Sequence, residues 1–267
     1  MLLETRTVEK PWGKDTLPAP FATPPGKRIG EIWFEPPRDL PQLLVKYIFT
    51  SEKLSVQVHP SDAQTEAAGL GHQGKEECWL VIDAEPDAKL GIGFAEPIGA
   101  EAMRAAALDG SIEDLLVWHP VKAGDFFYIP ANTVHAIGAG CSIIEIQQNS
   151  DITYRLYDYG RPRELHLEQA IAVAKGEPHD PALGKHVSPG DVPLVAGPLF
   201  RLDQVEGLPS HDQAAQYHGC LLVIPRTGTA RVGSEPVSPG QCALARSLDD
   251  VVFDPAGSCL IAQPLAR

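Results

Sequence analysis

Four residues with metal-binding side chains lie in three short segments of the chain. Gln57 and His59 are two apart in LSVQVHP, so in an extended strand their side chains share one face. Glu77 lies in a second strand-like segment, GKEECWLVI, and His135 lies in GDFFYIPANTVHAIG. Imidazole, carboxamide and carboxylate groups that meet across neighbouring strands are suitable ligands for a borderline divalent cation such as Zn²⁺. The sequence therefore predicts a metal site built from these four residues.

The elements that must position these side chains have β character. The chain has 24 Gly and 25 Pro, and its short apolar runs are separated by turn dipeptides, which is typical of antiparallel β structure. Pro60 ends the strand that carries Gln57 and His59, because proline cannot donate to the ladder. Other strands are predicted at residues 29–35, 43–50, 77–83 and 88–94, before Pro11, and in VKAGDFFYIP, VHAIG, CSIIEIQQ and DITYRLYDYG.

Four segments depart from this pattern. Residues 97–117 are rich in Ala, Leu and Glu, which predicts a helical insertion interrupted at Asp109-Gly110. The apolar spacing in RELHLEQAIAVAKG predicts an amphipathic helix that ends at Gly176, and residues 178–193 are expected to be a linker. Residues 62–73 are expected to form a loop or short helix at the mouth of the site.

Short strands resume after Pro193 at intervals typical of a second, smaller barrel or sandwich. The predicted organisation is therefore mainly β, in two units. A metal-binding domain covers residues 1–160, a helix and linker cover 161–192, and a smaller β domain covers 193–267.

Composition restricts the partners. A formal net charge of -13 argues against a nucleic-acid or anionic-membrane binder, although it allows a small phosphorylated substrate held by a local basic group. No signal-like segment opens the chain and no apolar run could span a bilayer, so the expected location is cytoplasmic. The five Cys are scattered without metal-binding spacing, which favours free thiols in a reducing compartment.

Several motifs together resemble one family. SVQVHP, GKEECW, GDFFYIPANTVHAIG and NSDITYRLYDYGR, with KPWG and GEIW upstream, resemble the class I mannose-6-phosphate isomerases of the cupin superfamily, especially the short bacterial type. The resemblance covers roughly residues 8–175 and fades afterwards. It implies a cupin-type jelly-roll β-barrel with a small helical insertion, followed by a second, degenerate β unit.

The resemblance also implies roles for individual residues. The zinc ligands, for one Zn²⁺ per chain, would be Gln57, His59, Glu77 and His135. The catalytic residues would be Lys75, Glu145, Asp151 and Arg155, and the phosphate would be bound by Lys46 and Ser55. The longer members of the family carry a histidine where this chain has Gly74, so that side chain has no counterpart here.

The reaction implied is the interconversion of mannose 6-phosphate and fructose 6-phosphate through an enediol-type intermediate. Arg155 would stabilise the negative charge, and Lys75, Glu145 and Asp151 are alternative proton carriers. The expected partner is a small sugar phosphate, bound by a monomer or small homo-oligomer.

Simpler roles remain open for several of these residues. Lys46 and Ser55 also suit a solvated strand, Glu145 suits a buried partner for Arg155, and Asp151 suits a turn cap. Arg161 and Arg163 are expected to be surface or salt-bridge residues, Trp79 a packing residue, and the other histidines structural.

Two other functions compete with the isomerase. An Fe(II) dioxygenase is one, because cupins support many reactions, but Gln57 together with Lys75, Asp151 and Arg155 argues against it. A non-catalytic cupin that binds a sugar phosphate as a sensor is the other, and it would bind metal and phosphate without turnover.

Overall fold

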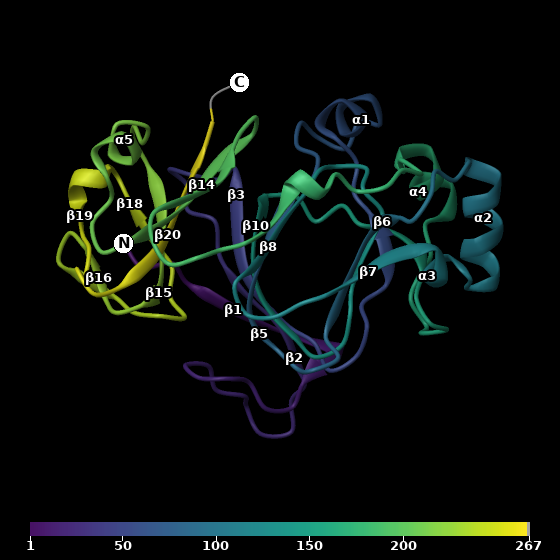
Figure 1. Ribbon diagram of the computed structural model, residues 1–267, viewed down its shortest axis with the longest axis horizontal. Coiled ribbons are helices and arrows are strands. Elements are labelled where there is room, and N and C mark those ends of the chain that lie inside the picture. The colour runs from purple at the N-terminus through teal and green to yellow at the C-terminus, as the bar shows by residue number, and fades with distance from the viewer. Residues whose placement is uncertain (266–267) are drawn as a thin grey trace.

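The computed structural model describes residues 1–265 and places two β units side by side, with the N-terminal unit carrying all the longer helices (Figure 1). The larger sheet of the N-terminal unit has seven antiparallel strands in the order β1-β2-β3-β10-β5-β8-β12. Their bounds are β1 (Thr5–Lys14), β2 (Ile29–Phe34), β3 (Leu43–Phe49), β10 (Cys141–Gln148), β5 (Glu77–Ala84), β8 (Asp125–Ile129) and β12 (Gly184–His186).

The second sheet of this unit has the order β11-β4-β9-β6-β7. Its strands are β11 (Tyr154–Tyr157), β4 (Val56–Val58), β9 (His135–Ile137), β6 (Lys89–Phe94) and β7 (Leu116–Pro120). Helices α2 (Ala100–Asp109), α3 (Ile112–Leu115) and α4 (Leu167–Val173) pack beside it, at the right of Figure 1. The predicted mainly β, cupin-type fold with a helical insertion is confirmed.

The C-terminal unit contains a five-stranded and a three-stranded antiparallel sheet, in the orders β13-β14-β20-β15-β18 and β17-β16-β19. The strands are β13 (Val192–Ala196), β14 (Phe200–Glu206), β15 (Leu221–Thr227), β16 (Ala230–Val232), β17 (Glu235–Val237), β18 (Ala243–Ala245), β19 (Val251–Val252) and β20 (Ser258–Pro264). The first residues of the chain join this unit, where Leu2 bridges to Ala243.

One hydrophobic cluster joins the two units. Tyr47 and Ile144 of the larger sheet belong to the same buried cluster as Phe200, Leu222 and Leu260 of the C-terminal unit. Both faces of strands β3 and β10 are therefore buried, one toward the barrel interior and the other against the C-terminal unit. This arrangement explains why the two strands appear in the sequence as nearly continuous apolar runs.

The structure differs from the expected elements in a few places. The segment expected to be a linker contains β12, which pairs with β8 and extends the first sheet. Strand β1 continues through Pro11 with an irregular register, which is tolerated because β1 is an edge strand. Helix α4 ends at Val173, before Gly176. Elements that the sequence did not predict are β7, β13, β17, α5 (His211–Ala214) and two short 3₁₀ helices.

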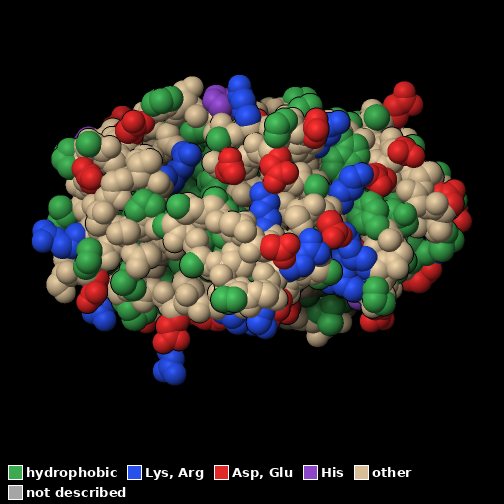
Figure 2. Space-filling view, turned by 90° about the horizontal axis from the view of Figure 1, so that it is seen from below, with side chains coloured by type: hydrophobic (Ala, Val, Ile, Leu, Met, Phe, Trp, Pro, Cys, Tyr) green, Lys and Arg blue, Asp and Glu red, His purple; other side chains and the backbone are tan. Residues whose placement is uncertain are grey.

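The cysteines, the helix lengths and the surface charges can also be compared with the expectations from composition. All five cysteines are free, and each except Cys220 is buried. No helix within residues 1–265 is both long and apolar enough to cross a bilayer. On the face seen from below Figure 1, Lys and Arg side chains are interspersed with Asp and Glu, so this face has no continuous basic surface (Figure 2).

Candidate active site

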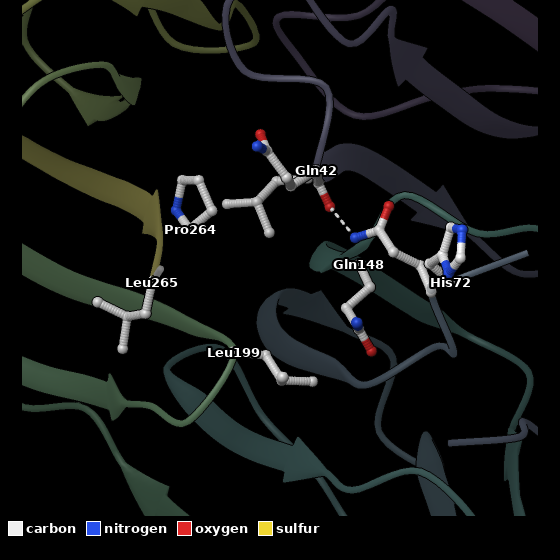
Figure 3. A pocket seen from close by; sticks show the side chains of 8 residues that line it. Gln42, His72, Gln148, Leu199, Pro264 and Leu265 are labelled. Atoms are coloured by element: carbon white, nitrogen blue, oxygen red, sulfur yellow. Dashed lines mark hydrogen bonds between the residues drawn. The ribbon is translucent and has the colours of Figure 1, made fainter. Parts of the chain in front are cut away.

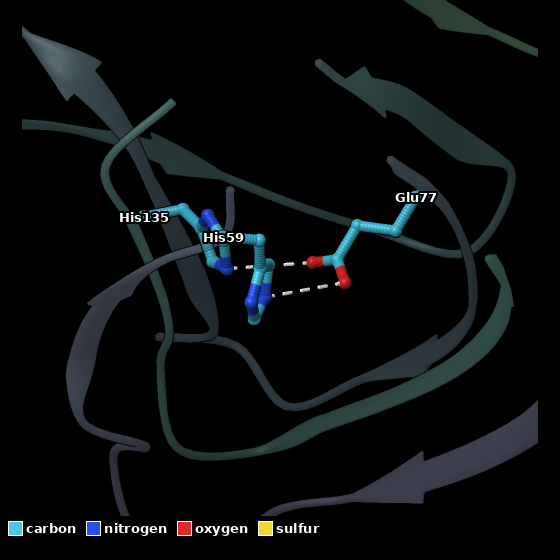
Figure 4. A group of neighbouring side chains, drawn as sticks. All are labelled: His59, Glu77 and His135. Carbon is cyan, nitrogen blue, oxygen red and sulfur yellow. Dashed lines mark ion pairs between the residues drawn. The ribbon is translucent and has the colours of Figure 1, made fainter. Parts of the chain in front are cut away.

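Three buried side chains point their ligand atoms at a common point inside the N-terminal barrel (Figure 4). One nitrogen from each of His59 and His135 and one oxygen from Glu77 lie within 4.8 Å of one another. His135 Nε2 is 3.4 Å from Glu77 Oε1, and His59 Nε2 is 3.5 Å from Glu77 Oε2. The three residues come from the ends of different strands, and together they form a donor set that suits a divalent cation.

The two imidazoles are held in the tautomer that a metal requires. His59 Nδ1 lies 2.8 Å from the carbonyl oxygen of Ile152, and His135 Nδ1 lies 2.9 Å from that of Thr133. A carbonyl oxygen can only accept, so each Nδ1 carries the hydrogen and each Nε2 is left as the acceptor atom, which faces Lys75 Nζ in His59 and Gln57 Nε2 in His135. Burial also lowers the pKa of both imidazoles, which keeps them neutral and able to bind metal.

Glu77 supplies negative charge that the protein only partly compensates. Its Oε1 is buried and accepts no hydrogen bond within the described residues, whereas Oε2 forms an ion pair with Lys75. Burial opposes ionisation of Glu77, but Lys75 and His135 outweigh it, so the carboxyl pKa lies below its ordinary value. Lys75 Nζ also lies 3.2 Å from His59 Nε2. The Lys75 ammonium therefore contacts Glu77 Oε2 and His59, whereas Glu77 Oε1 remains without a hydrogen-bond donor among the described residues.

Gln57 lies next to these three residues. Its Nε2 is 3.4 Å from His135 Nε2, and its Oε1 accepts a hydrogen bond of 3.0 Å from Ser55. Binding a metal through the carboxamide oxygen would therefore require the amide to turn over. The two ends of the amide have nearly the same shape, so this change needs little space.

Strand register gathers the other candidate residues into two rows. In the smaller sheet, Arg155 is opposite Gln57, which is opposite His135. Directly opposed residues in antiparallel strands project to the same side, so these three side chains face the barrel interior.

The second row crosses the larger sheet. Trp33 is opposite Lys46, Lys46 is opposite Glu145, and Glu145 is opposite Trp79. This row faces the same interior as the first, so the polar groups of the two sheets meet across the barrel.

A cavity of about 260 Å³ opens between the two rows. It is lined by the predicted site residues Lys46, Ser55, Gln57, Lys75, Glu145, Asp151 and Arg155. The remaining three predicted residues are the ligand candidates His59, Glu77 and His135, which are almost completely buried at 1–2% exposure. The ten residues therefore form one continuous region.

Lys46 and Glu145 form a buried ion pair in this cavity. Lys46 Nζ is 2.7 Å from Glu145 Oε2, and Trp79 Nε1 donates to Glu145 Oε1 at 2.9 Å. Burial disfavours the Lys46 ammonium, but Glu145 and Glu31 outweigh it and raise its pKa to about 12. Glu145 is thus the partner of Lys46 and not of Arg155, and Trp79 contributes a hydrogen bond as well as packing.

Arg155 differs from the other cations of the cavity, because no carboxylate within residues 1–265 forms an ion pair with it. Its Nε is buried without a hydrogen-bond partner, and burial followed by the nearby Arg163 lowers its pKa. The other lining cations are paired, in Lys10–Glu31, Lys46–Glu145, Lys75–Glu77 and Arg163–Asp158. Arg155 is therefore the cation available to an anionic ligand.

Sequence reasoning assigned no role to several residues of the cavity wall. They are Lys10, Trp12, Glu31, Trp33, Ser150, Thr153 and Arg163. The motifs KPWG and GEIW contain the first four, so the signal was present in the motifs. Arg163 was expected at the surface or in a salt bridge, and it does pair with Asp158, but it also lines the cavity.

A larger cavity of about 470 Å³ lies elsewhere, between the N-terminal barrel and the end of β20 (Figure 3). Its wall contains Leu43, Leu199 and Leu265, and its polar groups include the carboxamides of Gln42 and Gln148. Among residues 1–265, no carboxylate, lysine or arginine and none of the metal-ligand candidates lines this cavity. Size alone therefore does not identify a candidate site, because the predicted site residues line the smaller, charged cavity.

The chain is similar in sequence to proteins that are named mannose-6-phosphate isomerase. The chain is 41% identical to a mannose-6-phosphate isomerase of Streptococcus mutans over 201 residues, which cover 71% of this chain and 62% of that protein. It is 45% identical to the mannose-6-phosphate isomerase ManA of Bacillus subtilis over 137 residues, which cover 49% of this chain and 43% of that protein. The chain thus spans less than two thirds of these relatives' length. No family model matches it.

Solved structures show the same fold over nearly the whole chain. A mannose 6-phosphate isomerase from Bacillus subtilis has a TM-score of 0.80 at 24% identity and covers 98% of both chains. A putative mannosephosphate isomerase from Archaeoglobus fulgidus has a TM-score of 0.75 at 19% identity, covering 99% of this chain and 98% of the other. These likenesses extend the shared architecture to the C-terminal unit.

Proposed function

This chain is a homologue of the mannose-6-phosphate isomerases, and we propose that it interconverts mannose 6-phosphate and fructose 6-phosphate in the cytoplasm. The observation that carries the proposal is the meeting of a His-Glu-His donor set with the unpaired Arg155 in one charged cavity. An isomerase of this kind must stabilise an enediolate and relay one proton between neighbouring carbons, and the cavity offers groups for both tasks.

One Zn²⁺ would be held by Gln57, His59, Glu77 and His135. The fixed Nδ1–H tautomers and the unsatisfied Glu77 oxygen support this assignment. When bound, the ion would supply Lewis acidity beside the oxygens on C1 and C2 of the substrate. The choice of zinc follows from the nitrogen- and oxygen-rich donor set and the family resemblance.

The proton is carried by Lys75, Glu145 or Asp151 in this proposal. A general base must reach the C1 and C2 hydrogens of a bound sugar, and all three side chains line the cavity. Lys75 and Glu145 are buried and ion-paired, whereas Asp151 is exposed at the cavity rim. The ion pairs of Lys75 and Glu145 stabilise their charged forms, so these two side chains can transfer a proton only when the substrate changes the pairing.

Arg155 stabilises the enediolate. No carboxylate of residues 1–265 pairs with its charge, it is opposite Gln57 in the strand register, and guanidinium keeps its proton at working pH. Lys46 and Ser55 anchor the phosphate, and binding energy from that remote group positions the reacting carbons.

A coupled assay with mannose 6-phosphate tests the proposal directly. Purified protein is assayed before chelation, after chelation, and after zinc is added back. Turnover that disappears with the chelator and returns with Zn²⁺ is the expected result. Bound iron together with oxygen consumption would contradict the isomerase assignment and favour a dioxygenase. A folded, zinc-replete protein that does not turn over mannose 6-phosphate would indicate a non-catalytic binding protein or an enzyme for another sugar phosphate.

A further inference from the structure

Asn132 adopts a backbone conformation that side chains other than glycine seldom occupy. Its φ is 74°, in the turn between β8 and β9 that precedes His135. Among the described residues, only Tyr159 (φ 54°) is another non-glycine residue with positive φ. Asparagine tolerates this region better than most residues, but glycine adopts it more readily. The contacts of the asparagine side chain are therefore of interest, because glycine at this position would lack them.

The Asn132 side chain joins two segments that surround the metal-ligand candidates. Its Nδ2 donates to the carbonyl oxygen of His59 at 3.3 Å and to Gln64 Oε1 at 2.6 Å. Gln64 belongs to α1 (Asp62–Ala67), and its Oε1 also accepts the backbone N–H of Ser61 in the capping box of that helix. One carboxamide thus connects the end of the His59 strand to the helix that follows it.

The Asn132 backbone completes the connection. Its N–H donates to the same His59 carbonyl at 2.8 Å, and its own carbonyl accepts from the N–H of Lys175 at 2.9 Å. The next residue, Thr133, supplies the carbonyl that accepts from His135 Nδ1. The orientation of the Asn132 peptide therefore affects both histidines, His59 through its own carbonyl and His135 through the neighbouring carbonyl.

We propose that Asn132 is a positioning residue that fixes the relative placement of His59 and His135 for metal binding. It acts through the two histidines and does not touch the metal or the substrate itself. The inference rests on the proposed metal site and adds to it a residue outside the ligand set. Hydrogen-bonded groups that orient metal ligands commonly change metal affinity by roughly 10–100-fold when they are removed.

The variant Asn132→Gly separates the side chain from the backbone. Glycine keeps the positive φ without strain, so the turn itself is preserved while both Nδ2 hydrogen bonds are lost. Asn132→Asp is the second variant, because it keeps the shape but places carboxylate oxygens opposite two acceptors, the His59 carbonyl and Gln64 Oε1. Neither variant alters a ligand atom.

Gln263→Ala provides the matched control. Gln263 is 6% exposed and Asn132 is 7% exposed. The Gln263 carboxamide donates to the carbonyls of His218 and Cys220 at 2.6 and 3.0 Å, in the C-terminal unit away from the cavity. The Gln263 Oε1 also accepts from the N–H of His218 at 3.3 Å. The control therefore loses three side-chain hydrogen bonds, and none of them reaches a metal ligand.

The measurements are the zinc dissociation constant by competition with a chromogenic chelator, the absorption spectrum of the Co²⁺-substituted protein, and the melting temperature. We expect Asn132→Gly and Asn132→Asp to weaken zinc binding roughly 10–100-fold and to shift the Co²⁺ bands, while Gln263→Ala lowers only the melting temperature. Folded variants with unchanged zinc affinity and spectrum would overturn the proposal, and so would an equal loss of affinity in Gln263→Ala.

The experiment distinguishes this proposal from the isomerase assignment. Zinc affinity and the Co²⁺ spectrum are measured without substrate, so they report on Asn132 even if mannose 6-phosphate is not turned over. Parent protein that binds no zinc would instead remove the metal site on which both proposals depend.

Discussion

At the scale of single residues, charge pairing separates Arg155 from the other cations of the cavity. Lys46, Lys75 and Arg163 each have a carboxylate partner, and their charge is largely neutralised before a substrate arrives. The charged form of Arg155 is instead disfavoured by burial and by the neighbouring Arg163, which lower its pKa. An anionic ligand would relieve both costs, which is why we assign Arg155 to the developing negative charge of the intermediate.

Replacing Arg155 with alanine should lower turnover by roughly 10²–10³-fold, the usual effect of losing one charge-stabilising donor. Zinc content, measured by metal analysis of the same preparation, should stay the same. Arg161→Ala is the control, because Arg161 pairs with Asp158 and Glu52 and does not line the cavity. Loss of metal from the Arg155 variant would show that the side chain has a structural role.

The Lys46–Glu145 pair leads to a stability prediction. Glu145→Gln keeps the shape and the oxygen that Trp79 donates to, but it leaves the Lys46 ammonium buried without its counter-charge. Removing one partner of a buried pair costs about 3–5 kcal/mol, so the unfolding free energy at pH 7 should fall by that amount. Urea denaturation of both proteins measures the difference.

The same difference should depend on pH. The pKa of Lys46 is raised from 10.5 to about 12 in the folded protein, so the pair stabilises the fold fully below about pH 10.5. As the pH rises toward 12 this contribution is lost. In Glu145→Gln burial acts on Lys46 without this counter-charge and lowers its pKa. The gap between parent and variant should therefore begin to narrow below pH 10.5 and continue to narrow toward pH 12, and a gap that widens as the pH rises would contradict the assignment.

At the scale of elements, the site depends on close contact between α1 and the start of β5. Ser61 caps α1 through a capping box, and Asp62 accepts from the N–H of Gly74 just before Lys75. A Cβ on Gly74 would lie 2.4 Å from both Pro60 O and Ser61 C, which is far inside contact distance. In this chain the backbone after His59 therefore occupies the space that a side chain at position 74 would need.

Gly74→Ala should therefore destabilise the protein and disturb Lys75. An added methyl group that meets rigid backbone costs about 1–3 kcal/mol, measurable as a lower unfolding free energy. Gly99→Ala is the control, since nothing lies within 4 Å of a Cβ there, and its change should stay within about 0.5 kcal/mol. Equal stability of the two variants would mean that the loop from Pro60 to Asp62 shifts easily.

At the scale of the whole molecule, the C-terminal unit packs against the larger sheet of the N-terminal unit, and the two units share one hydrophobic core. Phe200 is fully buried in the cluster that also contains Tyr47 and Ile144, which alternate along their strands with Lys46 and Glu145. The same strands thus carry cavity residues on one face and packing residues on the other. The C-terminal unit thereby supports the sheet that holds the Lys46–Glu145 pair.

Phe200→Ala tests this coupling. Loss of a buried phenylalanine costs about 3–5 kcal/mol, and because the core is shared, both units should unfold in one transition at lower denaturant. Tryptophan fluorescence reports on the N-terminal unit, which contains all four tryptophans, and far-UV circular dichroism reports on both units. Leu208→Ala, 64% exposed, should leave the midpoint nearly unchanged. Two separate transitions would show that the units fold independently.

The sequence alone determined the mainly β architecture, the helical insertion and the candidate residues of the site. These features are local, because strand alternation places Gln57 beside His59 and composition marks residues 97–117 as helical. Motifs in sequence order then identified His135, far along the chain. Elements weakly marked by composition, such as β12 in a segment of turn residues, could not be predicted, since their pairing comes from the neighbouring strand.

Only the tertiary structure decided which groups pair. Lys46 and Glu145 are 99 positions apart in the chain and meet because β3 and β10 have one particular register, so that Glu145 pairs with Lys46 and no carboxylate of the described residues pairs with Arg155. The contacts of Asn132 with His59 and Gln64 likewise depend on the packing of three segments. Register and packing arise from the balance of burial over the whole chain, which no local pattern encodes.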